Sequence, residues 1–279
     1  MCFKKKLMLL CGLLCVAGTT QAADDEFGIW TSVGVEKKIS KKFSVDAGVD
    51  FRSDQNLQSV ARWSGSLGVG YKPLKWLKLG ASYTYIYDRS TQEAKQNYTK
   101  NGKLNGYNVD HGFWRSKHRG VVEATAKHKL GRFEVSLRER YMFTHYVGTE
   151  CLRTRYRDEA QGGYTGKTFE WDGHYFTQKE MGVDTKGAKN RHYLRSRIKV
   201  EYDIRKCPLT PFVSYELSNN LAEGFDLDKS RLSAGVDWKI NKQHAHSVAY
   251  LYERGADFES ADDGSGHLHV LDIGYKFDF

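Results

Sequence analysis

Apolar and polar residues alternate along five stretches of the chain. In residues 43–52 every odd position is apolar and every even position is Ser, Asp, Gly or Arg, and the same period of two recurs in residues 77–87, 191–205, 231–240 and 271–279. A period of two is typical of β-strands that have one apolar and one polar face. Since the chain also has only three prolines, we expect an all-β protein.

The connections between these stretches are of two lengths. The short ones fall at residues 40–42, 73–75, 130–132, 206–209 and 241–243, and the long ones near residues 53–60, 88–115, 147–190, 218–229 and 255–266. A soluble β-sandwich also alternates, but strands of about ten residues with aromatic ends, charged inner faces and alternating long and short connections favour a membrane barrel. We therefore predict an antiparallel transmembrane β-barrel of about 10–12 strands, with short periplasmic turns and longer extracellular loops.

The pattern yields about eleven strands, whereas bacterial single-chain barrels have an even number. We expect the count to be off by one. Either residues 24–28 thread upward before the first descending strand, or a strand is hidden in a long connection. The aromatic-rich stretch 149–177 could also extend into strands above the membrane.

The first residues have the form of a secretory signal. Three lysines precede a short apolar stretch, and Thr20-Gln21-Ala22 supplies small residues for cleavage, so we assign residues 1–22 to the signal and 23–279 to the barrel. No later run of eighteen apolar residues offers a helical anchor. Only Cys151 and Cys207 follow the signal, and we expect them at opposite ends of the barrel as free thiols.

The net charge changes the choice of partner. The formal charge of +9 falls to +6 when Lys4, Lys5 and Lys6 leave with the signal. An exported chain rarely meets nucleic acid, so we expect no nucleic-acid partner. The expected partners of a Gram-negative outer-membrane protein are lipopolysaccharide, outer-membrane lipid and small anionic solutes.

The last strand carries a terminal aromatic pattern. Tyr275, Phe277 and Phe279 alternate with polar residues up to the last residue. This resembles the C-terminal signal that outer-membrane barrels present to the barrel-assembly machinery, although the last strand of a sandwich could look similar.

The polar faces of the predicted strands are rich in charge. They would line the lumen with the basic residues Arg52, Arg62, Arg119, Arg138, Arg140, Arg195, Arg197 and Arg231, and with the carboxylates Asp46, Asp50, Glu123, Glu134, Glu201, Asp203 and Asp237. Folding the hairpin about Gly131 brings Glu123 level with Arg138 and Arg140. Two interpretations stay open: a lumen closed by salt bridges, or a basic track for an anionic solute.

Glu139 does not fit this register. It falls in the phase assigned to lipid, where a charge would cost about 2 kcal/mol at mid-depth. We expect a β-bulge near residues 137–140 that turns Glu139 inward. The alternative is a carboxylate at a partner surface.

Histidines and hydroxyls suggest two further kinds of site. His244-Ala-His246 and His267-Leu-His269 have a spacing that could hold a metal, but solvated loop histidines are the simpler interpretation, and we expect neither metal nor cofactor. A rim hydrolase or acyltransferase could use Ser116, His118, His145, Asp110 and His111. Since no spacing singles these residues out, we predict no catalytic residues and no enzyme.

Several segments resemble a known family. They are residues 27–45 (FGIWTSVGVEKKISKKFSV), Arg62-Trp63 leading into 67–71, residues 77–85, and residues 131–141. These are similar to the uncharacterised outer-membrane proteins of domain-of-unknown-function family 2490, common in Bacteroidota. The resemblance implies a barrel in the outer membrane and transfers no activity. The expected function is a narrow channel for small anionic solutes; a structural or ligand-binding barrel with a closed lumen is the alternative.

Overall fold

The computed structural model of the protein describes residues 25–54, 57–158, 168–222, 224–255 and 267–279. The predicted signal segment, residues 1–22, lies outside the described residues, as does the last long connection beyond Gly255. The regular elements of the described residues are β-strands, as the alternation predicts. Within these ranges, no helix has the length and apolar character needed to cross a membrane.

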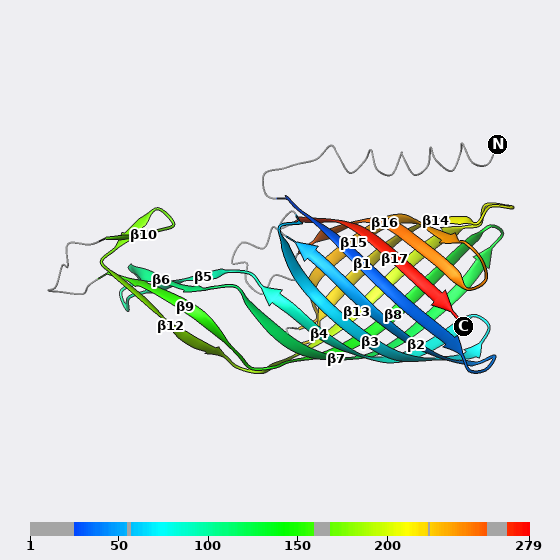
Figure 1. Ribbon diagram of the computed structural model, residues 1–279, viewed down its shortest axis with the longest axis horizontal. Helices are drawn as coiled ribbons and strands as arrows, with labels where there is room; N and C mark the ends of the chain where they lie inside the picture. Colours follow the sequence, from blue (N-terminus) through cyan, green and yellow to red (C-terminus); the bar gives the residue numbers. More distant parts are fainter. Residues whose placement is uncertain (1–24, 55–56, 159–167, 223, 256–266) are drawn as a thin grey trace.

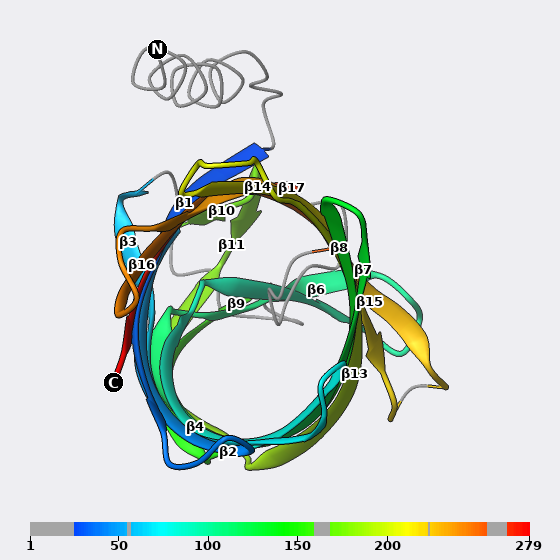
Figure 2. The same cartoon turned by 90° about the vertical axis from the view of Figure 1, so that its right-hand side faces the viewer.

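Eleven strands close into a barrel (Figures 1 and 2). Around the wall they follow the order β1, β17, β16, β15, β14, β13, β8, β7, β4, β3 and β2. Their bounds are β1 Asp25–Lys38, β2 Phe43–Asp54, β3 Ser59–Leu74, β4 Leu77–Ser90, β7 Phe113–Leu130, β8 Phe133–Tyr146, β13 Lys189–Tyr202, β14 Leu209–Asn220, β15 Asp226–Lys239, β16 His244–Arg254 and β17 His267–Asp278. The predicted barrel of about 10–12 strands is confirmed.

The barrel closes through one parallel pair. β1 runs beside β17 in parallel, from the pair Asp25 and His267 to the pair Glu36 and Asp278, whereas the other neighbouring strands of the wall are antiparallel. The expected even count is therefore wrong. With an odd number of strands, the first and the last run in the same direction, and residues 25–28 open β1 itself instead of adding a strand.

The two faces of the wall differ in polarity. Outward side chains include Val49, Leu67 and Ile198, which are 61%, 66% and 47% exposed, while the alternate positions turn charged and small polar residues into the lumen. An apolar band around a closed barrel needs a covering of lipid. The distribution is that of a membrane-spanning barrel.

The two ends of the barrel are also different. The five short turns predicted from the sequence lie at the same end as the C-terminus, and the long connections lie at the other end, where β1 begins (Figure 1). Cys207 follows β13 at the turn end and Cys151 lies beyond the loop end, and both are free thiols. The predicted pair of separate thiols is confirmed.

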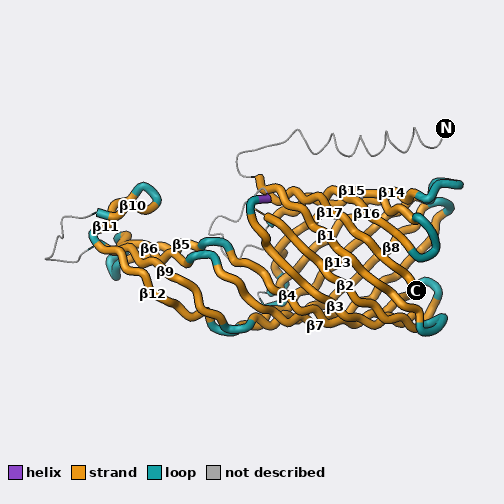
Figure 3. Tube along the Cα trace, in the orientation of Figure 1, coloured by secondary structure: helices purple, strands orange, loops and turns teal. Residues whose placement is uncertain are grey.

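Two of the long connections fold into an extension beyond the loop end. β5 (Glu93–Tyr98), β6 (Leu104–Asp110), β9 (Thr149–Arg157) and β12 (Gln178–Lys186) form a four-stranded sheet in the order β12, β9, β6, β5, and β10 (Phe169–Trp171) pairs with β11 (His174–Phe176). Figure 3 shows this strand structure projecting from the barrel. The expectation of strands within residues 149–177 is confirmed.

The extension has a small apolar core of its own. Tyr107, Val109, Tyr156 and Phe176 are buried together, and Trp171 stacks on Tyr156 with ring centroids 5.4 Å apart. Gly106 permits the close approach of β6 to β9, because its φ is +143° and an added Cβ would lie 1.8 Å from the carbonyl oxygen of Tyr156.

Glu139 faces outward. β8 pairs with β7 and β13 without a register shift from residue 133 to residue 146, so the predicted β-bulge is wrong. The Oε2 atom of Glu139 instead accepts a hydrogen bond from Ser196 Oγ on β13, at 2.6 Å. A local hydrogen bond on the outer face, not a change of register, satisfies this carboxylate.

Candidate functional site in the lumen

Two rows of arginines face each other on adjacent strands of the lumen wall. The antiparallel register of β8 and β13 sets Arg138 opposite Arg197 and Arg140 opposite Arg195. Alternation places both arginines of each strand on the inner face. Like charges in directly opposite positions repel, so this part of the wall needs counter-charges or a bound anion.

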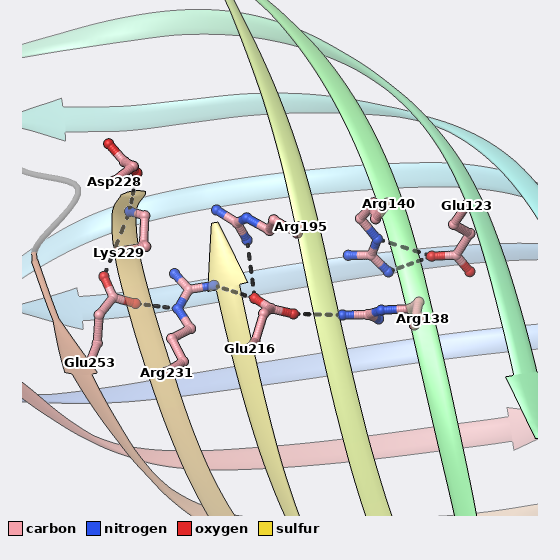
Figure 4. Close-up of polar contacts among 9 residues, drawn as sticks. All are labelled: Glu123, Arg138, Arg140, Arg195, Glu216, Asp228, Lys229, Arg231 and Glu253. Atoms are coloured by element: carbon pink, nitrogen blue, oxygen red, sulfur yellow. Dashed lines mark hydrogen bonds and ion pairs between the residues drawn. The ribbon is translucent and has the colours of Figure 1, made fainter. Parts of the chain in front are cut away.

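Carboxylates on either side neutralise most of this charge (Figure 4). On β7, Glu123 accepts hydrogen bonds from Arg140 Nε and Nη2, at 2.9 and 2.6 Å. On β14, Glu216 accepts from Arg138 Nη2 at 2.8 Å and from Arg231 Nη1 at 3.2 Å. The rows of arginines are thus held between two glutamates.

The network continues toward the loop end of β15 and β16. Arg231 also binds Glu253, whose other oxygen lies 3.7 Å from Lys229 Nζ. Arg195 Nη1 lies 3.7 Å from Glu216. Glu253 is 2% exposed and Glu216 is 8% exposed, so these charges are stabilised by their partners and little by water.

Arg197 differs from the other three arginines of the two rows. It makes no hydrogen bond or ion pair with a described residue, and its Nε atom, like that of Arg138, is buried without a hydrogen-bond partner among the described residues. A guanidinium has five N–H donors and no acceptor. Arg138 and Arg197 therefore leave donors that an anion could occupy.

Two adjoining cavities run along the arginine rows. The larger, of about 870 Å³, reaches the turn end and is lined by Arg138, Arg197 and Lys199 on one side, with Asp46 and Asp50 across from them. The smaller, of about 330 Å³, lies toward the loop end. Its lining contains Arg52, Arg62, Arg119 and Arg195. The two cavities share Asp46, Asp50, Ser64, Ser66, Lys78, Glu123 and Arg140, so they meet at mid-lumen.

A tryptophan lies inside the barrel near the loop end. The Cζ atom of Arg52 is 3.9 Å from the centroid of the Trp30 ring, and that of Arg231 is 5.3 Å away. Arg52 also donates to Asp50 at 2.9 Å. Cations over an aromatic face are attracted by its quadrupole, so Trp30 helps to hold two of the predicted lumen arginines.

Most of the residues predicted for the lumen are there. Those that line the cavities are Asp46, Asp50, Arg52, Arg62, Arg119, Glu123, Arg138, Arg140, Arg195, Arg197 and Asp237. Arg231 forms ion pairs with Glu216 and Glu253. Glu134 pairs with Lys127, and Glu201 pairs with Lys199. Asp203 is a correction: it is exposed in the connection at the turn end, because β13 stops at Tyr202.

Several residues that complete the site lie outside the set predicted from the sequence. They are Glu216, Glu253, Trp30, and Asp88, which binds both Arg62 and Lys117. A signal for Glu216 was present, because it stands between Ser214 and Ser218 in the polar phase of its strand. Only the closed barrel, however, shows which arginines this glutamate meets.

The residues proposed for a rim enzyme make other contacts. Asp110 binds Arg153 and Lys186, and His111 Nε2 lies 2.8 Å from Thr154 Oγ1. On the outer wall Ser116 Oγ bonds Tyr85, His118 bonds Tyr83 and His145 bonds Asn190. These five described residues do not form a Ser-His-acid relay.

The paired histidine motifs lie in strands, not in solvated loops. His244 Nδ1 is 2.6 Å from Tyr275 Oη, His267 Nδ1 is 2.7 Å from Tyr252 Oη, and His269 bonds Tyr250. Each imidazole on β16 or β17 thus pairs with an aromatic neighbour across the strand. These aromatic pairs, with Trp238 near His246, lie in the outer belts of the barrel.

One described cluster has metal-ligating atoms close together. Asp110, Cys151 and Asp184 place one ligand atom each within 4.8 Å of one another in the extension. Burial opposes ionisation of Asp110, but hydrogen bonds from Arg153 and Lys186 outweigh it and lower the pKa of this carboxyl. Burial raises the pKa of the Cys151 thiol. The ion pairs of Asp110 with Arg153 and Lys186, together with a thiol whose pKa is raised, fit an ion-paired core and not a metal site.

The C-terminal aromatic residues lie where the sequence places them. Tyr275 and Phe277 belong to β17, and the ring of Phe277 packs edge-on against Phe279, with centroids 4.4 Å apart. Phe279 is 63% exposed at the turn end. Their recognition by an assembly machinery stays a prediction.

A closed barrel with an apolar exterior and an arginine-rich lumen defines the class of this protein as a β-barrel of the membrane-spanning type. The chain belongs to the DUF2490 family, described as a protein of unknown function, whose match covers residues 27–263. The predicted family membership is confirmed. No curated protein matches the chain.

Among solved structures, the chain is similar to the β-domain of the Bordetella autotransporter BrkA. The TM-score is 0.43 and the sequence identity is 12%, over 85% of this chain and 82% of that chain. A likeness at this identity and score says nothing about function.

Proposed function

We propose that this protein is an outer-membrane barrel whose lumen conducts small anionic solutes. The observation that carries the proposal is the pair Arg138 and Arg197, which face each other across β8 and β13 at the side of the larger cavity. Arg197 lies opposite Glu216 in the register of β13 and β14, but among the described residues it makes no hydrogen bond or ion pair, and the buried Nε donors of both arginines lack acceptors there. A small anion would supply the missing acceptor.

The other charges of the lumen support a path along one wall. From the loop end, an anion would meet Arg62 and Arg119, then the arginine rows, then Lys199 near the turn end. A succession of donors lets an ion exchange one partner for the next without losing all coordination. Asp46 and Asp50 on the opposite side would repel the anion toward the basic wall.

The environment of the barrel belongs to the same proposal. Its apolar exterior fits outer-membrane lipid, and phosphorylated lipopolysaccharide fits the basic balance of the chain. The exposed C-terminal residue Phe279 fits delivery by the barrel-assembly machinery. The proposal also includes export directed by residues 1–22 and location in the outer membrane of a Gram-negative bacterium.

A second candidate is a structural or ligand-binding barrel with a closed lumen. The network from Glu253 through Arg231 and Glu216 to Arg138 favours it, because paired buried charges occupy the lumen near its loop end. That the protein is not an enzyme stays a prediction.

Bilayer conductance separates these two functions. Chain 23–279, refolded into a planar bilayer under a potassium chloride gradient, is expected to conduct with a reversal potential that shows a preference for chloride. Arg197→Gln should reduce this preference, while Arg89→Gln, at an exposed position outside the lumen at the end of β4, should leave it unchanged. A folded protein without conductance would support the closed barrel, and a cation preference would overturn the anion path.

A further inference from the structure

Each of the five short turns carries exposed cations, and these turns surround one rim of the barrel (Figure 2). They are Lys37, Lys38, Lys41 and Lys42 at the first turn, Lys72 and Lys75 at the second, Lys129 and Arg132 at the third, Arg205 and Lys206 at the fourth, and Lys239 and Lys242 at the fifth. We call these residues the basic ring. It is a continuous feature of the turn end and not a patch on one side.

The carboxylates near this rim form their ion pairs with lysines outside the basic ring. Glu36 binds Lys276, Glu201 binds Lys199 and Glu134 binds Lys127. None of these three lysines belongs to the basic ring. Asp203 is the exposed carboxylate in the connection between β13 and β14, beside the cations of the fourth turn.

Apolar side chains stand beside the cations at the same level of the barrel. The exposed ones are Ile39, Phe43, Leu74, Trp76, Leu130, Phe133, Trp238, Ile240 and Phe279. Exposed aromatic residues at the end of a membrane barrel mark the boundary between hydrocarbon and headgroups. Lysine side chains at that boundary extend their ammonium groups toward the headgroups.

We infer that the basic ring binds the anionic phospholipid headgroups of the leaflet at the turn end. All five turns carry cations, so the charge lies on every side of the rim, as a surrounding lipid leaflet requires. The apolar anchors fix the cations at headgroup depth, where an anionic surface attracts lysine and arginine. The inference rests on the proposed membrane location but not on conduction through the lumen.

The lipid next to the ring can be identified by fluorescence quenching. Trp76 and Trp238 lie at the turn end and are 54% and 46% exposed. Replacing the outer-wall residues Trp63 and Trp114 with Phe leaves these two as the lipid-facing reporters of the barrel. The full chain is then reconstituted in phosphatidylcholine vesicles that contain either brominated phosphatidylglycerol or brominated phosphatidylcholine.

We expect brominated phosphatidylglycerol to quench these tryptophans several-fold more effectively than brominated phosphatidylcholine at low salt. The triple substitution Lys42→Gln, Lys75→Gln and Lys242→Gln should measurably reduce the preference, because it removes three of the twelve cations of the ring. The matched triple substitution Lys100→Gln, Lys103→Gln and Lys179→Gln, in the extension, should preserve it. Inorganic phosphate should reduce the preference no more than chloride of equal ionic strength.

Three outcomes would overturn the inference. Equal quenching by the two lipids, a preference that the turn substitutions leave unchanged, or specific displacement by inorganic phosphate would each show that the basic ring does not select anionic lipid. An absence of quenching by either lipid would refute the membrane location itself, which separates that failure from a failure of headgroup binding.

Discussion

Three arginines of the lumen converge on Glu216. Arg138 and Arg231 donate to its two oxygens at 2.8 and 3.2 Å, and Arg195 lies 3.7 Å away. The substitution Glu216→Gln keeps the size of the side chain and removes its negative charge. It would leave three nearly buried guanidinium groups without this counter-charge.

The expected cost follows from the burial of the network. The side chains of Glu216, Arg138, Arg195 and Arg231 are 10%, 14%, 11% and 9% exposed. Removing one partner of a buried ion pair costs about 3–5 kcal/mol, because the remaining charge is neither solvated nor paired. Arg231 keeps Glu253, so we expect about 3 kcal/mol, or about a hundredfold change in the unfolding equilibrium.

Reversible unfolding in guanidinium, in lipid vesicles and at neutral pH, measures this free energy. Glu134→Gln is the matched control, because Glu134 pairs with Lys127, whose side chain is 51% exposed at the turn end. An exposed pair contributes about 0–1 kcal/mol. The same preparations should show a stronger anion preference for Glu216→Gln in bilayer recordings, since a negative charge leaves the lumen.

A loss no greater than that of the Glu134 control would refute this account. It would mean that water in the lumen solvates the arginines, so that the ion pairs add little to stability. A double-mutant cycle between Glu216→Gln and Arg138→Gln tests the same point. Additive losses would show that the two side chains are not coupled, although they lie within hydrogen-bonding distance.

Three other predictions concern single groups. Glu139→Gln should stabilise the barrel in bilayers by up to about 2 kcal/mol, because the carboxylate faces lipid; destabilisation relative to the native protein in guanidinium unfolding would contradict this. Ion pairs lower the pKa of Asp110. The stability that this carboxylate contributes is therefore fully present above the ordinary carboxyl pKa of about 4 and is lost as the pH falls through the lowered pKa. Acid titration of tryptophan fluorescence should show a transition in the extension, and Asp110→Asn should abolish this pH dependence. Alkylation followed by mass spectrometry should modify Cys207 first, because the Cys151 thiol is buried and has a raised pKa; equal rates in the folded protein would refute this order.

The strand count departs from a general rule for bacterial barrels. Alternation and turn spacing indicate eleven strands, as the barrel has, whereas the rule predicts an even number. The barrel closes instead by pairing β1 with β17 in parallel over twelve residue pairs. Outward Val33 meets outward Tyr275, and inward Glu36 meets inward Asp278, so the parallel pairing preserves both faces of the wall.

The position of Glu139 shows a second limit. From the sequence, a charge in the apolar phase indicated an irregular register. The strand is regular, and the compensation comes from Ser196 on the neighbouring strand. The sequence does not indicate that the Ser196 hydroxyl contacts Glu139. This contact is established only by the pairing of β8 with β13.

The sequence by itself determined the properties that follow from alternation and from its interruptions. Alternation gives the all-β class, the apolar outer face and the inward position of most of the predicted lumen charges, and the interruptions give the short turns. Tertiary structure decided the closure through β1 and β17, the folding of the long connections into a second sheet, and the partners of each arginine. The physical reason is that alternation is a local property of one strand, whereas ion pairs such as Glu216 with Arg138 join strands whose register and order only the closed barrel establishes.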